Sequence, residues 1–578
     1  MGTLTITNLT ATQIYLSDFS VPLEGGKTVS IEATINDLQE ITDIHSKKAA
    51  GTISLSFTYG ADELASGIVP LPGSFKGAIS QSSLELTTAT TLWIDVVNGS
   101  DSNTGTQTSP LKTITAAVAS LPPTLSANVT LNLKPGTYRE EPTLDFKFTK
   151  NARFTLQGTD WMTTTPATGP STGTIASSTG SPLVLSVTGA TWTVNDLKKS
   201  FVFLTSGSKS GEAFPICSNT SNTIEIAGCE NQSAWFNSST FKIGKPAATL
   251  IGVQARAWTL LIQGANPTAI TAGLTSSGGT TQSPRYLLSS LEFLPNNPLA
   301  TASASSRYGL YVYLAGVQLS QCAFTDDGVT TFGGIYVLEP TDLLVDKCYL
   351  STKSSGGSPA LNMSFGIKSS KAMSISGSLF DSGGVGFRGY STSPTSSTVY
   401  FNNDTYGSCV FQNQANAAIV AGAISVGTNG PVYIRTGVVG IVGLGASVYG
   451  TVIISDMSSH GIHLQYADGT VLPGMAYLSS ISITSCGGDA IRLESLHTQL
   501  HITGSANIAN NTGYGVNTAP VVQSQGNMVF IDSAVTMSSN TAGDFLLSGA
   551  TVNSLTDLRS APSKTLTDTA RFTRIIGG

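Results

Sequence analysis

Gly309-Leu310-Tyr311-Val312 and Gly334-Ile335-Tyr336-Val337 are two copies of one short motif: a small residue, an apolar residue, any residue, then usually another apolar residue. Ten copies run through the second half of the chain, and subtracting their starting numbers gives intervals of 18 to 32 residues. The other eight begin at Gly366, Gly384, Ser408, Pro431, Gly461, Ala490, Gly513 and Asp544. A repeat of this length is typical of stacked, solenoid architectures.

The apolar residues of each copy alternate with a period of two, which indicates a β-strand. One such strand is too short to bury its own apolar face, so successive copies must stack on one another. The repeats therefore predict an all-β fold, a parallel β-helix. We expect it to be right-handed, because crossovers between parallel strands almost always are.

Composition narrows the class of protein. Charged residues make up 11% of the 578 residues, against about 25% in an average soluble protein, while 40% are hydrophobic, which excludes a disordered chain. The net charge is -6 and no cluster of Lys and Arg occurs, so we expect no nucleic-acid partner. No apolar run approaches the ~18 residues of a membrane span, so we expect no membrane insertion.

The cysteines and the N-terminus indicate the cellular compartment in which the chain is made. Six cysteines are widely spaced, with no CxxC pair and no metal-ligand spacing, so we expect reduced thiols and neither a metal site nor another cofactor. Residues 1–7 have neither the basic nor the apolar region of a secretory signal. Synthesis in a cytoplasm combined with a surface rich in Ser, Thr, Asn and Gly favours localisation in a virus particle.

The chain divides into segments of different character. Short alternating strands and a helix expected at residues 36–50 predict a small mixed α/β N-terminal domain. The β-helix contains a β-rich insertion, where short strands are separated by Asn and Gly turns. The predicted segments are the N-terminal domain 1–75, a linker 76–92, the β-helix 93–555 with the insertion at about 195–246, and a C-terminal tail 556–578.

Two stretches carry family resemblances. The first stretch resembles the opening of pectate-lyase-like right-handed β-helix proteins. It consists of residues 93–106 and 109–118, followed by Val129-Thr-Leu-Asn-Leu-Lys-Pro-Gly-Thr-Tyr138. In that family a helix, here Ile114–Leu121, caps the first coil. Asp95 and Asp101 in this stretch could suggest calcium, but Asx turns in a Gly-rich loop are the favoured interpretation.

The N-terminal domain resembles short domains of bacteriophage virion accessory proteins, and the β-rich insertion resembles those of phage spike β-helices. These resemblances identify the chain as a suspected bacteriophage spike or fibre protein. They imply a homotrimer with threefold symmetry, attachment to other virion proteins through the N-terminal domain, and possible contact with a host surface polysaccharide.

A fold alone does not define an activity, so a catalytic function would have to be carried by particular residues. Glycoside hydrolysis needs two carboxylates, and the best local cluster contains Asp326, Asp327 and Glu339, with Asp342, Asp346, Asp381 and Arg388 nearby. A solvated turn face is the favoured interpretation, so we expect no catalytic site there. Polygalacturonase-like enzymes place their Gly-His-Gly motif after an Asp pair, whereas here His460 precedes Asp489 and Arg492. The histidines between residues 460 and 501 are interpreted as surface side chains.

Tyr311, Tyr336 and Tyr433 occupy the variable third place of their repeats, which predicts that they face outward. Such tyrosines could stack on sugar rings, but contact with a partner chain is the favoured interpretation. The sequence therefore leads to the hypothesis of a structural virion spike or fibre of a tailed phage. Two alternatives stay open: a tailspike depolymerase that hydrolyses or eliminates glycans, and a ligand-free decoration protein of the capsid or collar.

Overall fold

The structure is a computed structural model of the whole chain. It describes residues 2–10, 13–16, 21–33, 53–58, 85–229, 233–253, 258–264, 285–294, 307–313, 315–325, 332–338, 342–351, 359–365, 373–391, 397–401, 407–422, 424–428, 430–444, 447–464, 475–494, 499–518, 527–531, 535–547, 550–554, 564–566 and 571–574. The chain forms two compact units: residues 1–89, 119–127 and 147–151 make the first, and the remainder makes the second.

The first unit contains small sheets. Strand β1 (Gly2–Asn8) pairs antiparallel with both β4 (Thr28–Ala33) and β5 (Ile53–Thr58), and β2 (Ile14–Leu16) pairs antiparallel with β3 (Val21–Leu23). A parallel sheet joins three further short strands, in the order β12 (Lys147–Phe148), β8 (Thr124–Leu125) and β6 (Glu85–Leu86). The helix expected at residues 36–50 lies outside the described residues.

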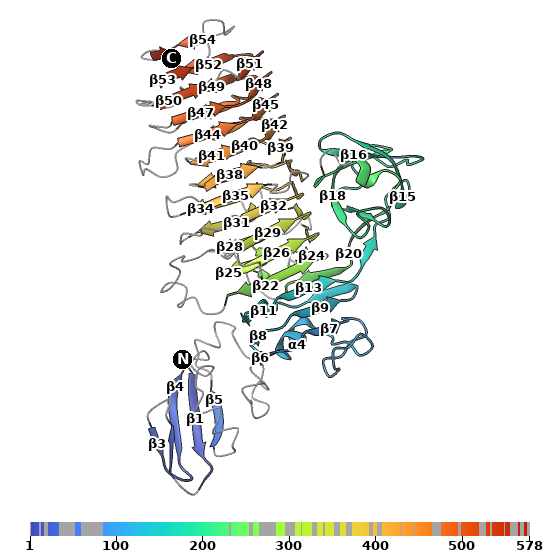
Figure 1. Ribbon diagram of the computed structural model, residues 1–578, viewed down its shortest axis with the longest axis vertical. Coiled ribbons are helices and arrows are strands. Elements are labelled where there is room, and N and C mark those ends of the chain that lie inside the picture. The colour runs from blue at the N-terminus through green and yellow to red at the C-terminus, as the bar shows by residue number, and fades with distance from the viewer. Residues whose placement is uncertain are drawn as a thin grey trace. The chain divides into compact units, whose positions relative to one another are not determined.

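The second unit is built on three long parallel sheets (Figure 1). Sheet I has fifteen strands: β7 (Thr90–Ile94), β9 (Val129–Leu133), β13 (Phe154–Gly158), β23 (Tyr286–Ser289), β26 (Gly316–Ser320), β29 (Asp342–Asp346), β32 (Met373–Ser376), β35 (Ser397–Phe401), β38 (Ile424–Thr428), β41 (Ser447–Tyr449), β44 (Met475–Ser479), β47 (Gln499–Thr503), β50 (Asn527–Ile531), β53 (Ala550–Ser554) and β55 (Arg571–Arg574).

Sheet II has twelve strands: β10 (Gly136–Arg139), β21 (Ala248–Ile251), β24 (Leu291–Leu294), β27 (Ala323–Phe324), β30 (Tyr349–Ser351), β33 (Leu379–Asp381), β36 (Cys409–Gln412), β39 (Val432–Arg435), β42 (Val452–Ser455), β45 (Ile481–Thr484), β48 (Asn507–Ala509) and β51 (Thr536–Ser538).

Sheet III has thirteen strands: β11 (Thr143–Leu144), β22 (Trp258–Gln263), β25 (Arg307–Tyr313), β28 (Phe332–Leu338), β31 (Pro359–Phe365), β34 (Val385–Ser391), β37 (Ala417–Gly422), β40 (Val439–Leu444), β43 (Ile462–Leu464), β46 (Ile491–Leu493), β49 (Tyr514–Asn517), β52 (Gly543–Leu547) and β54 (Lys564–Leu566).

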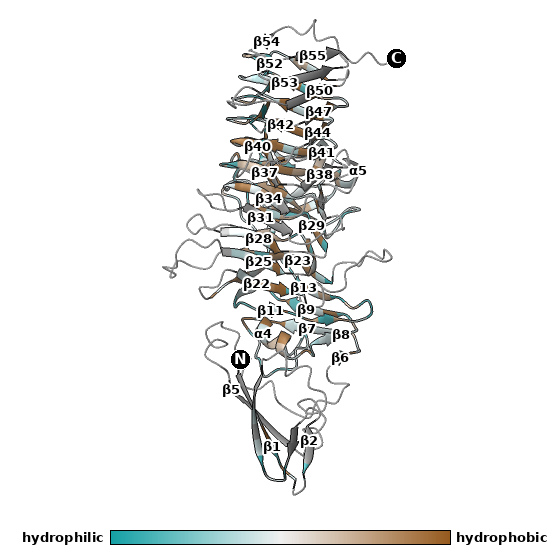
Figure 2. Cartoon of the chain, turned by 90° about the vertical axis from the view of Figure 1, so that its left-hand side faces the viewer, coloured by the Kyte–Doolittle hydropathy of each residue, from teal (hydrophilic) through white to brown (hydrophobic). Residues whose placement is uncertain are grey.

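The chain visits the three sheets in turn, so one strand from each makes a rung and each strand pairs in parallel with the next rung's strand. Side chains that point inward are apolar, and hydrophobic residues recur from rung to rung in Figure 2. In the interior, Phe380 stacks on Phe411 with ring centroids 4.3 Å apart. These observations confirm the predicted parallel β-helix.

The small first residue of the sequence motif has a steric cause. A Cβ atom added to Gly440 would lie 2.4 Å from the carbonyl oxygen of Gly461 on the next rung. At Gly461 the added atom would meet the Ala490 carbonyl oxygen at 2.7 Å. At these two neighbouring rungs of sheet III the residue before the inward-facing isoleucine packs against the backbone of the next rung, which leaves room only for a small side chain.

Two copies of the motif belong to a different sheet from the others. The copies that begin at Ser408 and Pro431 form β36 and β39 of sheet II, whereas those at Gly309 and Gly334 lie in sheet III. The copy that begins at Gly366 lies outside the described residues, and β31 supplies that rung instead. The motif is shared because strands of both sheets alternate inward and outward residues in the same way.

The corner after each sheet II strand has a repeated backbone conformation. On seven successive rungs the residue that follows the strand has a positive φ between 54° and 64°. These residues are Ser382, Asn413, Thr436, Asp456, Ser485, Asn510 and Ser539. A single left-handed residue turns the chain sharply, and stacked corners of the same shape keep the next strands in register.

A separate antiparallel sheet forms a side module (residues 161–246) on the second unit. Its strands are β14 (Trp161–Thr163), β15 (Thr172–Thr179), β16 (Leu183–Val187), β17 (Phe201–Leu204), β18 (Ala213–Asn219), β19 (Thr223–Ile226) and β20 (Thr240–Pro246), with helix α5 (Ser233–Phe236). The insertion was expected to begin near residue 195, but β14 to β16 already belong to this sheet. Ser, Thr and Gly in these early strands weakened their strand signal.

The borders of the β-helix also differ from those predicted. Strand β7 begins at Thr90, inside the stretch predicted as a linker, and pairs with β9. Strands β54 and β55 lie in the predicted C-terminal tail, yet they continue sheets III and I. The C-terminal strands were missed because each of them, Lys-Thr-Leu and Arg-Phe-Thr-Arg, carries one apolar residue.

The opening segment contains the expected helix, α4 (Ile114–Ala119). Glu140 accepts hydrogen bonds from the main-chain N–H groups of Ile114 and Thr115, both at 2.8 Å, and so satisfies donors at the start of the helix. Asp95 accepts bonds from the N–H groups of Val97 and Asn98, which confirms the Asx turn. No helix among the described residues has the length and hydrophobicity needed to cross a lipid bilayer.

Candidate functional site

The structure describes some of the candidate residues named from the sequence but not all of them. Asp326, Asp327 and Glu339 lie outside the described residues, so their candidacy stays a prediction. Of their neighbours, Asp346 pairs with Lys347 at 2.9 Å, and Asp381 is buried and accepts a 2.8 Å bond from the side chain of Asn413. These two carboxylates are therefore already engaged.

Tyr311 and Tyr336 stack on adjacent rungs of sheet III, as their shared place in the motif predicts. Their ring centroids are 5.0 Å apart with an interplanar angle of 10°, and both side chains are partly exposed. Trp258 extends this aromatic row, since its ring lies 5.1 Å from that of Tyr311. The indole N–H of Trp258 is buried without a hydrogen-bond partner among the described residues.

Tyr433 departs from the prediction. It points away from the rung interior, but it lies in sheet II and is only 8% exposed, because the side module covers it. Its hydroxyl is hydrogen-bonded to the Ser181 hydroxyl of the module. Tyr433 is therefore a contact inside the chain and does not share a surface with Tyr311 and Tyr336.

The side module is attached to the outer face of sheet II by an apolar cluster. The rungs contribute residues at one outward position, and the module contributes large side chains such as Trp161 and Phe201, whose rings are 5.2 Å apart. The rung residues are Ala323, Tyr349, Leu379, Val410 and Tyr433, one from each of five successive strands. We call this set the outer ladder.

Polar contacts flank the outer ladder. Arg435 of β39 donates two hydrogen bonds to Glu225 of β19, at 2.8 and 2.6 Å. Burial alone would raise the pKa of Glu225, but the bonds and charge of Arg435, with a bond from Ser218, hold that pKa below its ordinary value. The Gln412 side chain donates to the carbonyl oxygen of Cys217 at 2.9 Å. The module and the rungs are thus joined by both apolar and charge-assisted contacts.

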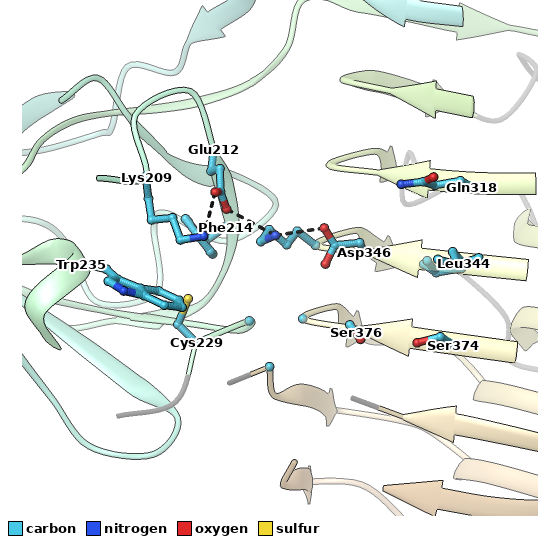
Figure 3. Close-up of a pocket in the computed structure, with 15 residues that line it drawn as sticks. Lys209, Glu212, Phe214, Cys229, Trp235, Gln318, Leu344, Asp346, Ser374 and Ser376 are labelled. Carbon is cyan, nitrogen blue, oxygen red and sulfur yellow. Dashed lines mark hydrogen bonds and ion pairs between the residues drawn. The ribbon is translucent and has the colours of Figure 1, made fainter. Parts of the chain in front are cut away.

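A cavity of about 390 Å³ lies between the module and sheet I (Figure 3). Trp235, Lys209 and Glu212 line it from the module, and Asp346, Ser374 and Ser376 line it from the rungs. The Lys209 ammonium lies 4.4 Å from the centre of the Trp235 ring. An aromatic ring with hydroxyl and charged groups around one cavity can hold a polar ligand.

Ion pairs join the charged side chains of this cavity. Lys347 lies 3.3 Å from Glu212 and 2.9 Å from Asp346, so one ammonium joins both carboxylates. Burial lowers the pKa of Lys347, but Asp346 and Glu212 together raise it above its ordinary value. Both carboxylates are therefore held in ion pairs with the same ammonium group.

A second polar cluster lies on sheet III, where His463 of β43 and Arg492 of β46 are paired on adjacent rungs. Arg492 Nε donates a 2.6 Å bond to Glu494 Oε1, and Arg492 Nη2 forms an ion pair with the same oxygen at 2.6 Å. His463 Nε2 lies 2.9 Å from Glu494 Oε2. His460 and Asp489 stand beside them in successive corners, and His460 Nε2 lies 3.4 Å from Arg492 Nη1. We call these five residues the histidine cluster.

The expectation that these histidines are ordinary surface side chains is therefore wrong for two of them. The side chains of His460 and His463 are 14% and 15% exposed. His501 lies between the rings of Tyr477 and Phe530, with centroid distances of 4.6 and 4.2 Å. The sequence signal was present, because His460 and Asp489 directly precede the motif copies that begin at Gly461 and Ala490.

Metal binding has no support in the described part of the chain, where no group of three or more His, Cys, Asp or Glu side chains converges. All six cysteines are buried free thiols. Burial raises the pKa of Cys229 to about 12 and that of Cys486 to about 11, so both thiols are protonated at neutral pH.

Comparisons with known proteins bear on the fold. The family described as "Protein of unknown function (DUF1565)" matches residues 97–180. No curated protein sequence matches the chain. The solved GH136 lacto-N-biosidase from Eubacterium ramulus is 10% identical, with a TM-score of 0.33, over 94% of this chain and 72% of that one.

Two phage proteins are also among the similar structures. The tailspike protein gp49 from Pseudomonas phage LKA1 is 10% identical, with a TM-score of 0.21, over 73% of this chain and 75% of that one. The Gp54 tailspike of Acinetobacter baumannii bacteriophage AP22, solved with a capsular saccharide, is 11% identical, with a TM-score of 0.19, over 77% and 74%. The pairing of the chain's own strands is what establishes the parallel β-helix.

Proposed function

We propose that this chain is a structural spike or fibre of a tailed-phage virion, with the N-terminal domain docked to the particle and the β-helix directed toward the host surface. The observation that carries the proposal is the uninterrupted stack of parallel rungs in sheets I to III. Each rung pairs only with its neighbours, so the stack forms a rigid rod whose length grows with the number of rungs. Such a rod suits a part that must reach from a particle to a cell.

Lateral association supports the same role. We infer a homotrimer in which the aromatic row of Trp258, Tyr311 and Tyr336 contacts a partner chain. All three side chains of the row are partly exposed. Aromatic side chains are enriched at protein interfaces, so an exposed aromatic row suits contact with a partner chain.

The test is to delete the gene and measure adsorption of the resulting particles to host cells. We expect particles that lack the chain to adsorb poorly, and adding back the purified protein to compete with wild-type particles. Normal adsorption without the chain would contradict the proposal and favour a decoration protein. New reducing ends or unsaturated sugars, released from host polysaccharide by the purified chain, would favour a depolymerase instead.

A further inference from the structure

His460 has a hydrogen-bond donor beside each of its two ring nitrogens. The main-chain N–H of Asp489 donates to Nδ1 at 3.0 Å, and Arg492 Nη1 lies 3.4 Å from Nε2. A main-chain N–H and a guanidinium can only donate, whereas a neutral imidazole accepts a hydrogen bond at one nitrogen only. Either tautomer of the neutral ring therefore satisfies one of the two donors, and the protonated ring satisfies neither.

Close packing holds the His460 ring between these donors. A Cβ atom added to Gly488 would lie 2.8 Å from His460 Nδ1, so the ring rests directly on the main chain that leads into Asp489. On the other side, Glu494 holds the Arg492 guanidinium with contacts of 2.6 Å. Protonation of the ring is therefore opposed at both nitrogens as long as the corner keeps this arrangement.

Asp489 joins three successive rungs. Its carbonyl oxygen accepts a hydrogen bond from the main-chain N–H of Gly461, before β43, at 3.1 Å. Its buried carboxylate accepts bonds from β49, namely from the Tyr514 main chain at 2.8 Å and the Asn517 side chain at 2.9 Å. A shift of Asp489 therefore changes contacts with the rungs on both sides of its own.

We propose that His460 is an acid-operated switch that loosens the corner at Asp489. The shorter contact makes Nδ1 the acceptor in the resting state, so a proton taken up from solvent binds at Nδ1 and breaks the bond from the Asp489 main chain. The new Nδ1–H turns to the Asp489 carboxylate, whose Oδ2 lies 3.8 Å away, while the imidazolium repels Arg492. The carboxylate is drawn away from Tyr514 and Asn517, and the contact between the rungs of β46 and β49 opens.

The charges around His460 give the direction of the pH dependence. They are Asp489, Arg492 and, through Arg492, Glu494, with His463 5.3 Å away between ring centroids. Burial lowers the pKa of His460, Asp489 raises it and Arg492 lowers it, and the net effect is a lowered pKa. The ring therefore takes up a proton more readily in the open corner, so acid favours opening. The closed corner keeps its full stability above the ordinary imidazole pKa of about 6.5 and loses up to about 10-fold per pH unit below it, until the lowered pKa is reached.

The test is hydrogen–deuterium exchange of the full chain at pH 5.0 and pH 7.5, read by mass spectrometry and corrected for the intrinsic pH dependence of exchange. We expect about 10-fold lower protection at pH 5.0 in peptides that cover residues 486–494 and 511–517, and equal protection at both pH values in β36 and β39. His460→Asn cannot take up the proton, but its Oδ1 can accept the Asp489 N–H, so its protection should not depend on pH. His501→Asn makes the same change at a partly buried histidine of sheet I and, as the matched control, should keep the wild-type response.

Arg492→Gln is a second variant that keeps the test decisive if His460→Asn does not fold. It removes the charge that opposes the imidazolium and offers Nε2–H an amide oxygen, so the loss of protection in acid should be smaller than in the wild type. Three results would overturn the switch: equal protection of the wild type at both pH values, the same loss in acid for His460→Asn or Arg492→Gln as for the wild type, or an equal loss in every peptide of the chain. The last result would indicate acid unfolding of the whole β-helix instead of one corner.

Discussion

Single side chains in the interior set the stability of each rung. Phe411 stacks on Phe380 and meets Phe401 edge to face at 5.6 Å. We expect Phe411→Ala to lower the free energy of unfolding by about 3 to 5 kcal/mol, because it leaves a cavity between rungs. Phe411→Leu keeps most of the volume and should cost less than about 1.5 kcal/mol. Urea denaturation of both variants measures the difference, and equal losses would contradict this packing role.

Glu225 and Arg435 make the attachment of the side module sensitive to acid. Because the pKa of Glu225 is lowered on folding, its stabilising contribution is complete above the ordinary carboxyl pKa and is lost as the pH falls through the lowered one. We expect Glu225→Gln to lower stability by roughly 1 to 3 kcal/mol near neutral pH, since it leaves a largely buried guanidinium without its charge partner. The loss should shrink below about pH 4.

Thermal melts of the wild type and Glu225→Gln from pH 3 to pH 7 test whether the stability difference shrinks as the pH falls. A difference in melting temperature that stays constant over the whole range would contradict it. Arg435→Gln should show the same trend, because it removes the other half of the pair.

The side module packs on the β-helix through one outward-facing position of the sheet II strands. The outer ladder is apolar beneath the module, whereas Ser482, Asn507 and Thr536 occupy the same position on later rungs. The change from apolar to polar side chains therefore follows the cover that the module provides.

A charge placed in the outer ladder should separate the module from the rungs. We expect Leu379→Asp to destabilise the chain by about 3 kcal/mol or more, because it buries an unpaired carboxylate. Ser482→Asp introduces the same carboxylate at the equivalent position of a later rung and should change stability by less than about 0.5 kcal/mol. Limited proteolysis gives a direct measurement: Leu379→Asp should release fragments of the module, and equal resistance of both variants would refute the contact.

At the scale of the whole molecule, the aromatic row predicts the state of association. Size-exclusion chromatography with light scattering should give three times the chain mass of 59.7 kDa. Tyr311→Glu combined with Tyr336→Glu should shift the mass toward the monomer, since two charges would be buried at the contact. Tyr433→Phe is the matched control, because Tyr433 contacts the chain's own module. A stable wild-type monomer at micromolar concentration would contradict the trimer.

The stack of rungs was predictable from sequence because its cause is local. Each copy of the motif carries alternating apolar residues and a small first residue, and both requirements repeat wherever one rung lies on the next. The Asx turn at Asp95 was equally readable, since it depends on residues two and three positions apart. The helix that begins at Ile114 was expected from the family resemblance, and its first N–H groups bond to the distant Glu140.

Only the tertiary structure decided which faces are exposed. Tyr433 looks like Tyr311 in sequence, but the side module, more than 180 residues earlier in the chain, covers one and leaves the other partly open. The histidine cluster likewise joins corners 29 residues apart, a distance set by the rung rather than by any local pattern. Sequence periodicity identifies the residues of a strand that face inward, because the inward residues of every rung pack into the same core. The outward side depends on what packs against it, and that is a property of the folded chain.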